Sequence, residues 1–138
     1  MVITKKLQFH TKGNCDVIDI TGEVSLAVRE SELESGTVTV FVSGSTAGVT
    51  TVEYESGLIH DLQVLFERIA PQGIDYRHNL RWGDGNGHAH IRASLLGASL
   101  TVPFTHKSLM LGTWQQVVFI DFDNRPRSRE LVLQLVGE

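Results

Sequence analysis

The chain has 138 residues, of which 41% are hydrophobic and 20% are charged, so it is able to build a folded core and is not a disordered chain. Its formal net charge is −4, from 12 basic and 16 acidic residues, and this argues against general nucleic-acid binding, which needs a basic face. No apolar run approaches the roughly 20 residues that span a bilayer, so we expect no membrane partner. The length fits one domain over residues 1–138.

The first predicted elements are a strand, a helix and a second strand. Residues 2–10 alternate between polar and apolar side chains, which predicts a strand with one buried face. Apolar residues then recur at helical spacing, so we expect a short amphipathic helix over about residues 22–32, which Gly36 ends. Residues 37–42 are dense in β-branched side chains, which is typical of a central strand.

The middle of the chain contains the clearest helix signal. A loop of small residues at 43–48 leads into a strand expected over residues 49–54. Apolar residues then occupy helical positions throughout residues 58–69, and Pro71 ends this helix. A long polar connection with several glycines follows over residues 71–87, and loops of this length in a small domain are usually functional or disordered.

A short helix over residues 91–96, closed by Gly97, precedes the last predicted strands. We expect these strands at residues 100–104, 109–111, 116–122 and 131–136. The last should pair as a hairpin with the strand before it, across a turn at residues 124–127. Many strands with two or three helices predict an α+β fold, in which antiparallel sheets pack like a sandwich and the helices flank them.

The single cysteine, Cys15, has no partner for an internal disulfide. A reducing compartment is therefore the simplest location. The first residues also lack the charge-then-apolar order of a secretory signal, so we expect a cytoplasmic protein.

Three of the six histidines, His78, His88 and His90, fall within one glycine-rich segment. Neutral imidazole is the commonest metal ligand, and catalytic zinc favours three protein ligands plus water. The segment therefore predicts a divalent-metal site, with zinc as the first choice. The alternative is that all three are exposed, hydrogen-bonding loop histidines. Asp84 and Asn86 would either orient the imidazoles or serve only as turn residues.

The spacing of His88 and His90 decides whether they share an ion. On an extended chain the two side chains point the same way, whereas in a regular helix they point nearly opposite ways. The predicted helix begins close to His90. We therefore expect His88 to lie in a non-helical lead-in, which Gly85 and Gly87 allow to turn back.

Other polar residues are candidates for catalysis. Glu53, at the end of a predicted strand, would act as general base beside a metal-bound water, or would simply face solvent. His60 is a further candidate at the start of the amphipathic helix. Trp114 is either a core residue or part of a binding platform, and Thr113 and Gln115 on either side of it would form polar pocket walls.

Two segments are candidates for binding an anionic substrate. Loop 43–48 offers backbone N–H groups and the hydroxyls of Ser45 and Thr46, although it lacks the lysine of a phosphate loop and a plain turn is the alternative. The only local basic cluster contains Arg125, Arg127 and Arg129. It is either a solvated turn or an anion clamp, since arginine holds phosphate or carboxylate through two N–H groups.

A second metal hypothesis concerns Asp121 and Asp123, which have the spacing of a ligand pair. Their flanking apolar residues make an ordinary alternating strand an equally good explanation.

Several short motifs occur together in the second half of the chain. They read Asp84-Gly85-Asn86-Gly87-His88-Ala89-His90-Ile91, Leu95-Leu96-Gly97, Val102-Pro103, Leu111-Gly112-Thr113-Trp114-Gln115-Gln116 and Pro126-Arg127. In this combination the chain resembles the YjbQ-like family, often called the secondary thiamine-phosphate synthase family, and the resemblance covers nearly the whole chain.

The resemblance implies a small α+β sandwich that assembles as a homo-oligomer, commonly a trimer, with a metal on the histidines. It also implies a weak ability to make thiamine phosphate from a pyrimidine pyrophosphate and a thiazole phosphate. The family's conserved polar positions correspond to Glu53, His78, His90, Thr113, Trp114 and Gln115. At the position of His88, many members of the family, but not all, have a histidine. Many members also have a histidine where this chain has Gly44, so the role of that histidine does not carry over to this chain.

Two functions remain open on the sequence. One is a metal-dependent enzyme acting on a small phosphorylated substrate. In it the three histidines hold the metal, Glu53 handles protons, and phosphate contacts come from Ser45, Thr46 and Arg127. The other is a non-catalytic metal- or ligand-binding homo-oligomer. The usual enzyme that makes thiamine phosphate is a (β/α)₈ barrel of about 200 residues or more, and this domain is too small for that fold. Whether a thiamine activity would be the main activity of this domain or a side activity stays open on the sequence.

Overall fold

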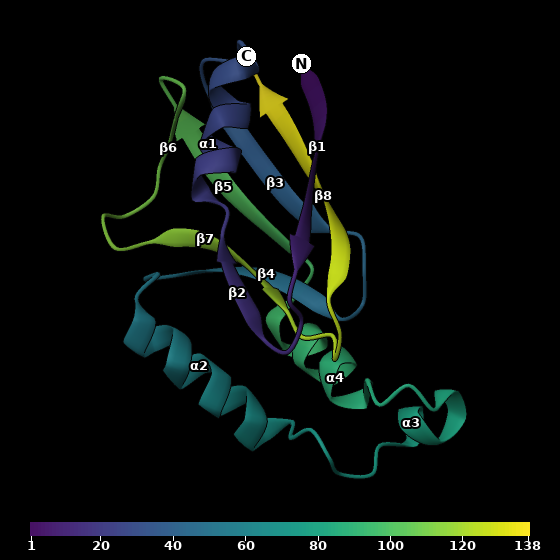
Figure 1. Ribbon diagram of the computed structural model, residues 1–138. Helices are drawn as coiled ribbons and strands as arrows, with labels where there is room; N and C mark the ends of the chain where they lie inside the picture. The colour runs from purple at the N-terminus through teal and green to yellow at the C-terminus, as the bar shows by residue number, and fades with distance from the viewer.

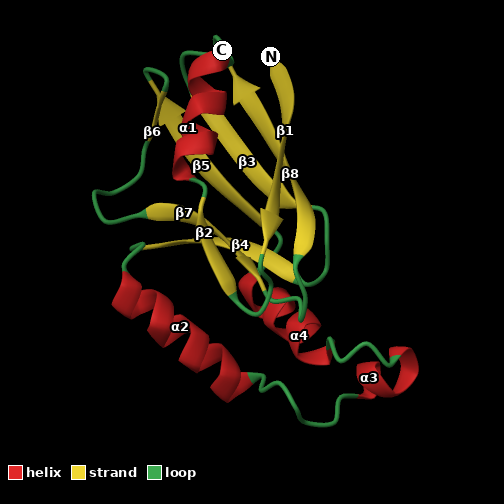
Figure 2. Ribbon diagram, viewed as in Figure 1, coloured by secondary structure: helices red, strands yellow, loops and turns green.

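The computed structural model describes all 138 residues. Eight strands and four helices follow one another as β1 (Val2–Thr11), β2 (Asp16–Asp19), α1 (Thr21–Glu30), β3 (Gly36–Val42), β4 (Ala47–Val52), α2 (Ser56–Ile69), α3 (Arg77–Trp82), α4 (Gly87–Leu96), β5 (Ser99–Thr105), β6 (Ser108–Leu109), β7 (Gln116–Asp121) and β8 (Arg127–Gly137). Figures 1 and 2 show two sheets, with α2 and α4 beyond the smaller one. All strand pairs are antiparallel, so the predicted α+β class is confirmed.

The larger sheet has the strand order β1-β8-β3-β5-β6. Side chains alternate between its two faces, because successive residues of a strand point in opposite directions. Ile3, Leu7 and Phe9 of β1 therefore pack on the core, while the alternate residues Thr4, Lys6 and Gln8 are exposed. Buried side chains of β8 and α1 complete this first core, among them Leu131, Leu133, Leu135, Val24 and Val28.

The smaller sheet has the order β2-β7-β4 and lies between two cores. Val117 and Phe119 of β7 point into the first core, toward the larger sheet. Val118 and Ile120 point the other way, into a second core. That second core is closed by the helices, through Phe66 of α2 and residues of α4. Because both faces of β7 are covered, its apolar residues run together without the usual polar alternation.

The expected hairpin between the last two strands is wrong. β8 pairs with β1 and β3 in the larger sheet, whereas β7 lies in the smaller sheet between β2 and β4. β2 itself, only four residues long, was not expected from the sequence. The chain changes sheets between Phe122 and Pro126, so the polar turn there joins two layers and not two neighbouring strands.

The segment expected as a structureless connection, residues 71–87, contains helix α3. Gly83 ends this helix in the left-handed conformation, at a φ of 66°, which a residue without Cβ adopts easily. Helix α4 then begins at Gly87, earlier than expected, and includes both His88 and His90. None of the four helices is long and apolar enough to cross a bilayer.

Candidate functional site

Two of the three predicted metal ligands meet between α3 and α4. The ring centroids of His78 and His90 lie 4.3 Å apart, with their planes at 44°. The Nδ1 atom of His78 lies 3.5 Å from Oδ1 of Asp84, in the turn that joins the two helices. This Nδ1 is shielded from solvent and has no hydrogen-bond partner. Imidazole nitrogens and carboxylate oxygens are groups that can ligate a divalent cation, so this is the candidate site with the most suitable chemistry.

The surroundings of the His90 ring favour its neutral form. Burial, the largest influence, lowers the pKa of His90, and the neighbouring His78 lowers it further. Asp84, Asp123 and a hydrogen bond to the backbone of Ser45 act in the opposite direction without reversing the shift. A neutral imidazole has a free lone pair, which is the form that binds metal.

His88 does not join this pair. In a helix, the side chains of residues i and i+2 point about 200° apart. Because α4 begins at Gly87 and includes both His88 and His90, these two side chains point to opposite sides of the helix. The expectation that His88 precedes the helix is therefore wrong. His88 is buried, its Nε2 has no partner, and its pKa is lowered first by burial and then by Arg92.

No three histidine, cysteine, aspartate or glutamate side chains of one chain are close enough to hold a metal ion among themselves. His78 and His90 therefore offer at most two metal donors, and Asp84 does not add a third to them. Such a pair needs water, substrate or a group from another molecule to complete the coordination of a zinc ion, which is usually tetrahedral.

Asp121 and Asp123 are fully buried, and arginines neutralise them. Arg129 donates two hydrogen bonds to Asp121, from Nε at 2.7 Å and from Nη2 at 2.8 Å. Arg127 Nη2 lies 3.0 Å from the Asp123 carboxylate, and the Thr46 hydroxyl donates to the same group at 3.0 Å. Burial raises the pKa of Asp123, but hydrogen bonds from Arg127, Asn86 and Thr46 hold it below its ordinary value. The two aspartates are thus structural ions of a polar network and have no free oxygen directed at a metal.

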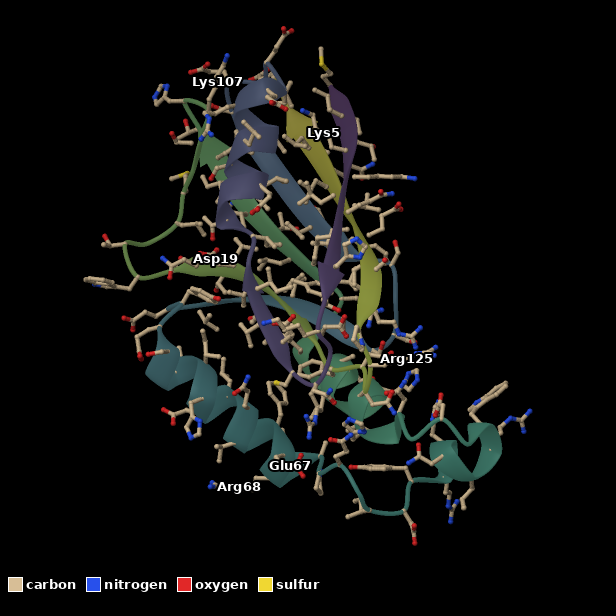
Figure 3. The ribbon with its side chains drawn as sticks, viewed as in Figure 1. Lys5, Asp19, Glu67, Arg68, Lys107 and Arg125 are labelled. Carbon is tan, nitrogen blue, oxygen red and sulfur yellow. The ribbon has the colours of Figure 1, made fainter.

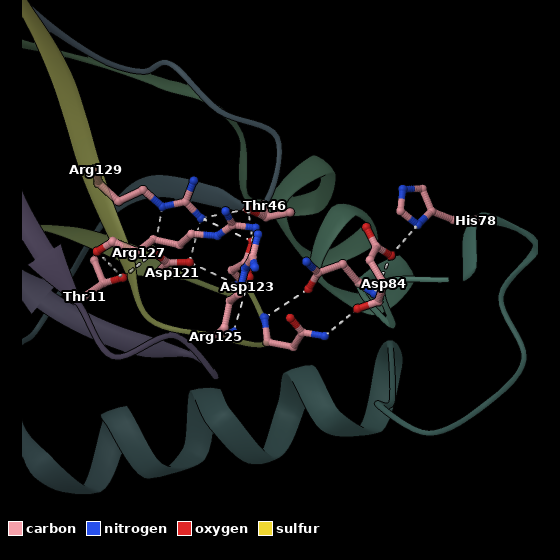
Figure 4. A network of polar contacts seen from close by, with 11 residues as sticks. Thr11, Thr46, His78, Asp84, Asp121, Asp123, Arg125, Arg127 and Arg129 are labelled. Carbon is pink, nitrogen blue, oxygen red and sulfur yellow. Dashed lines mark hydrogen bonds and ion pairs between the residues drawn. The ribbon is translucent and has the colours of Figure 1, made fainter. Parts of the chain in front are cut away.

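The same network extends to Asp84, which lies beside His78 (Figure 4). Asn124 donates from its backbone to Asn86 Oδ1 at 2.9 Å and from its side chain to the Asp84 carbonyl at 2.7 Å. The Gly87 N–H donates to Asn79 Oδ1 at 2.8 Å, which ties the start of α4 to α3. Sequence reasoning missed Asn79 and Asn124, because an asparagine beside a turn is ordinary and nothing in the pattern distinguishes these two.

Two cavities are lined by residues of this candidate site. One, of about 240 Å³, is lined by Gly44, Ser45, His90, Ser94 and neighbouring small residues. The other, of about 210 Å³, is lined by Asp84, Asn86, Asn124, Arg125 and Arg127. Two of the predicted anion-binding residues, Ser45 and Arg127, therefore line separate cavities, one bordered by His90 and the other by Asp84. The hydroxyl of Thr46 also accepts a hydrogen bond from Arg129, which engages it within the buried network.

The remaining predicted residues lie at the other end of the smaller sheet. Ser45 precedes β4 and Glu53 follows it, and a six-residue strand spans about 20 Å. Trp114 and Thr113 are exposed in the loop before β7, and His60 is exposed on the first half of α2. Figure 1 shows the β6–β7 loop and the start of α2 on the side of the molecule away from α3. A single chain does not bring these residues to the histidines.

The geometry defines the class of the protein as a two-sheet α+β domain. This domain carries a histidine pair and a buried arginine–aspartate network. The sequence profile described as "UPF0047 protein YjbQ-like" matches residues 5–138, so the chain belongs to the YjbQ family. It is 36% identical over 137 residues to a UPF0047 protein of Methanothermobacter thermautotrophicus, covering 99% of this chain and 94% of that protein. It is 34% identical over 135 residues to the UPF0047 protein YugU of Bacillus subtilis, covering 96% and 98%.

Solved structures agree with the fold. A hypothetical protein from Aeropyrum pernix K1 superposes with a TM-score of 0.91 at 31% identity, over 99% of each chain. A YbjQ-like protein of unknown function from Sulfolobus solfataricus P2 superposes with a TM-score of 0.90 at 28% identity, over the whole of both chains. The relatives establish the family and the architecture, and their names assign no activity.

Proposed function

We propose that the protein is a metal-dependent enzyme acting on a small phosphorylated substrate, with a divalent cation, zinc first, held at His78 and His90. The observation that carries this proposal is the contact between the rings of His78 and His90. The Nδ1 atom of His78 is buried, has no hydrogen-bond partner and lies beside Asp84. His88 faces the core and is left out of the proposed ligand set. A reducing, cytoplasmic setting suits the lone buried thiol of Cys15.

The residues of this chain have separate roles in the proposal. Ser45 and Arg127, at the rims of the two cavities, bind the phosphate of the substrate. Asp84 orients His78, and the buried network holds α4 in place. Glu53 moves protons, while Thr113, Trp114 and Gln115 line the substrate site. When bound, the cation supplies a Lewis acid that polarises a phosphoryl or carbonyl oxygen.

Metal analysis tests the ligand assignment directly. His78→Ala and His90→Ala should each lower the zinc content per chain, measured by plasma mass spectrometry after dialysis, while circular dichroism shows an unchanged fold. His106→Ala is the matched control, because this histidine is exposed on the turn between β5 and β6. Full zinc occupancy in both site variants would overturn the assignment.

The first reaction to test is the one that the family resemblance implies, formation of thiamine phosphate from a pyrimidine pyrophosphate and a thiazole phosphate. The wild-type protein should turn over with bound metal and lose turnover after treatment with a chelator. Turnover that is unaffected by the chelator would contradict a metal-dependent reaction.

A non-catalytic metal- or ligand-binding homo-oligomer is the second candidate function. It is favoured by one observation, the distance of about 20 Å along β4 between the histidine end of the chain and Glu53. Bound metal without turnover on any phosphorylated substrate would support this alternative. The homo-oligomer, with a trimer as the state implied by the resemblance, is common to both proposals.

A further inference from the structure

The loop between β3 and β4, residues 43–46, carries backbone N–H groups that the chain itself does not use. Both ends of the loop are fixed, because the Val42 N–H donates to the Ala98 carbonyl at 2.8 Å and the Thr46 carbonyl accepts from the Phe122 N–H at 2.9 Å. None of the four N–H groups of residues 43–46 donates a hydrogen bond within the chain. Because a backbone N–H is an obligatory donor, four consecutive free ones form a row that an outside acceptor is able to engage.

A positively charged group lies directly beside this loop. Arg129 donates to Asp121 and Thr46 through its Nε and Nη2 atoms, whereas its third nitrogen, Nη1, makes no hydrogen bond (Figure 4). A Cβ added to Gly44 would lie 3.1 Å from this Nη1, so the missing side chain of Gly44 leaves space beside the nitrogen. Because Asp121 holds the guanidinium through two bonds, Nη1 is oriented before any ligand binds.

A free hydroxyl and an open volume lie at the same corner of the fold. The hydroxyl of Ser45 makes no hydrogen bond, whereas that of Thr46 is engaged within the buried network. Gly44 and Ser45 line the cavity of about 240 Å³ that His90 also borders. The rest of its lining is alanine, serine and glycine, so no carboxylate side chain faces the cavity to repel an anion.

The number of free donors indicates which anion fits. Four N–H groups, the Ser45 hydroxyl and Nη1 of Arg129 make six donor groups. A carboxylate has only about four acceptor positions on its two oxygens. The terminal phosphate of a monoester has three strong acceptor oxygens and a larger charge, and it is commonly held by backbone N–H groups together with arginine.

We propose that the β3–β4 loop and Nη1 of Arg129 bind the terminal phosphate of a small-molecule monoester, and that Gly44 makes room for it. That this monoester is the substrate of an enzyme rests on the proposed function, whereas the binding of phosphate does not. Arg129 thereby gains a second role, since its Nε and Nη2 hold the two sheets together while Nη1 faces the ligand. The phosphate lies close to His90 in this arrangement, because both border the same cavity.

Titration of the metal-free, full-length chain with inorganic phosphate tests the site without any turnover. Calorimetry at pH 7.5 should show one saturable site per chain. Gly44→Ala should weaken binding about tenfold or more, because the new Cβ covers Nη1 and removes a charge-assisted hydrogen bond. The substitution is conformationally allowed, since Gly44 does not have a positive φ.

Gly112→Ala is the matched control, because a Cβ there meets its nearest atom at an ordinary 3.7 Å. This variant should bind phosphate as the wild type does. Equal affinity in Gly44→Ala and the wild type, or no saturable binding in the wild type, would overturn the site.

Amide spectra locate the bound anion without relying on any variant. In ¹H–¹⁵N spectra of the wild-type chain, inorganic phosphate should shift the N–H resonances of residues 43–46 most, with the affinity measured by calorimetry. Acetate should bind more weakly, because it has fewer acceptor positions. Largest shifts in another part of the chain would overturn the location, and acetate affinity equal to that of phosphate would overturn the ligand class.

Methyl phosphate separates a monoester site from a site for free phosphate. It should bind with an affinity similar to that of inorganic phosphate, because the cavity of about 240 Å³ leaves room for the ester group. Binding of inorganic phosphate alone would overturn the monoester. Binding of both without turnover on any phosphorylated substrate would support the site and count against the proposed function. Turnover with an unchanged KM in Gly44→Ala would overturn the site and leave the proposed function intact.

Discussion

Arg129 and Asp121 form a bidentate ion pair that joins the two sheets. Asp121 is the last residue of β7 in the smaller sheet, and Arg129 lies near the start of β8 in the larger one. Their two hydrogen bonds, at 2.7 and 2.8 Å, are made where the carboxylate is fully buried. The pair thus fixes the corner at which the chain passes between layers, and through Asp123 and Asn86 that corner reaches the histidine site (Figure 4).

Removing one member of this ion pair should destabilise the fold strongly. Arg129→Leu leaves the Asp121 carboxylate buried without its partner, which costs roughly 3–5 kcal/mol of the free energy of unfolding. Urea denaturation followed by circular dichroism measures this loss. Arg68→Ala, at an exposed position of α2 (Figure 3), should change the unfolding free energy by less than about 0.5 kcal/mol. A similar, small effect of both substitutions would show that the pair has no structural role.

Gly87 sets the approach of α3 to α4. A Cβ at this position would lie 2.5 Å from Cβ of Tyr76 and 3.1 Å from Asn79 Oδ1. Gly87→Ala should therefore push α3 away, separate His78 from His90 and weaken zinc binding at least several-fold in a competition titration. Gly22→Ala is the control, because a Cβ there meets no atom within 4 Å. Unchanged zinc affinity in Gly87→Ala would mean that the histidines do not act together.

Cys15 should be inert in the folded protein. It is buried, and burial raises the pKa of its thiol to about 11, so little thiolate exists at pH 8. Labelling with a chromogenic disulfide reagent at pH 8 should be slow in buffer and fast in urea. Rapid labelling of the native protein would contradict the buried position.

The raised pKa of the Cys15 thiol predicts that the fold loses stability at alkaline pH. The pKa of this thiol is 9.0 when exposed and about 11 in the fold, so the folded state keeps a proton that the unfolded chain releases. The contribution of the protonated thiol to the free energy of unfolding is complete below pH 9 and disappears as the pH rises toward 11. Cys15→Ser should show a smaller drop in the urea midpoint between pH 8.5 and 10.5 than the wild type. Identical pH profiles would contradict the raised pKa.

The sequence predicted long periodic elements well and short ones poorly. The helix expected over residues 58–69 became α2, because its apolar stripe is long enough to define a face. Helix α3 was missed because six residues without one buried side chain carry no apolar period. The strand order was also missed, because the continuous apolar run of β7 shows that both its faces are covered but not which strands lie beside it.

The candidate site was predicted in part, and the limits have a physical origin. The pattern indicated that His78 and His90 belong together, and the structure places their rings in contact. Helix α4 begins at Gly87 and not at residue 91, and this earlier start turned His88 into the core. Helix boundaries are the least certain part of any pattern. Asp121 and Asp123 were ambiguous because the arginines that neutralise them follow in the next strand, and a pairing across sheets leaves no local signal.

The substitution Glu53→Gln tests whether metal binding and turnover depend on different residues. Glu53 lies far from the histidines of its own chain, so Glu53→Gln should leave the zinc content unchanged while abolishing turnover. Gln substitutes a neutral group of the same shape, which removes proton transfer and little else. Plasma mass spectrometry and the thiamine-phosphate assay on one preparation provide both readouts. Full turnover in this variant would remove Glu53 from the mechanism.

The most direct measurement of the central claim is a crystal structure of the zinc-loaded protein, with the metal located by anomalous scattering at the zinc edge. We predict one peak per chain, within about 2.1 Å of a ring nitrogen of both His78 and His90. An anomalous peak elsewhere, or histidine rings that contact each other with no metal between them in crystals grown with excess zinc, would contradict the proposed metal site.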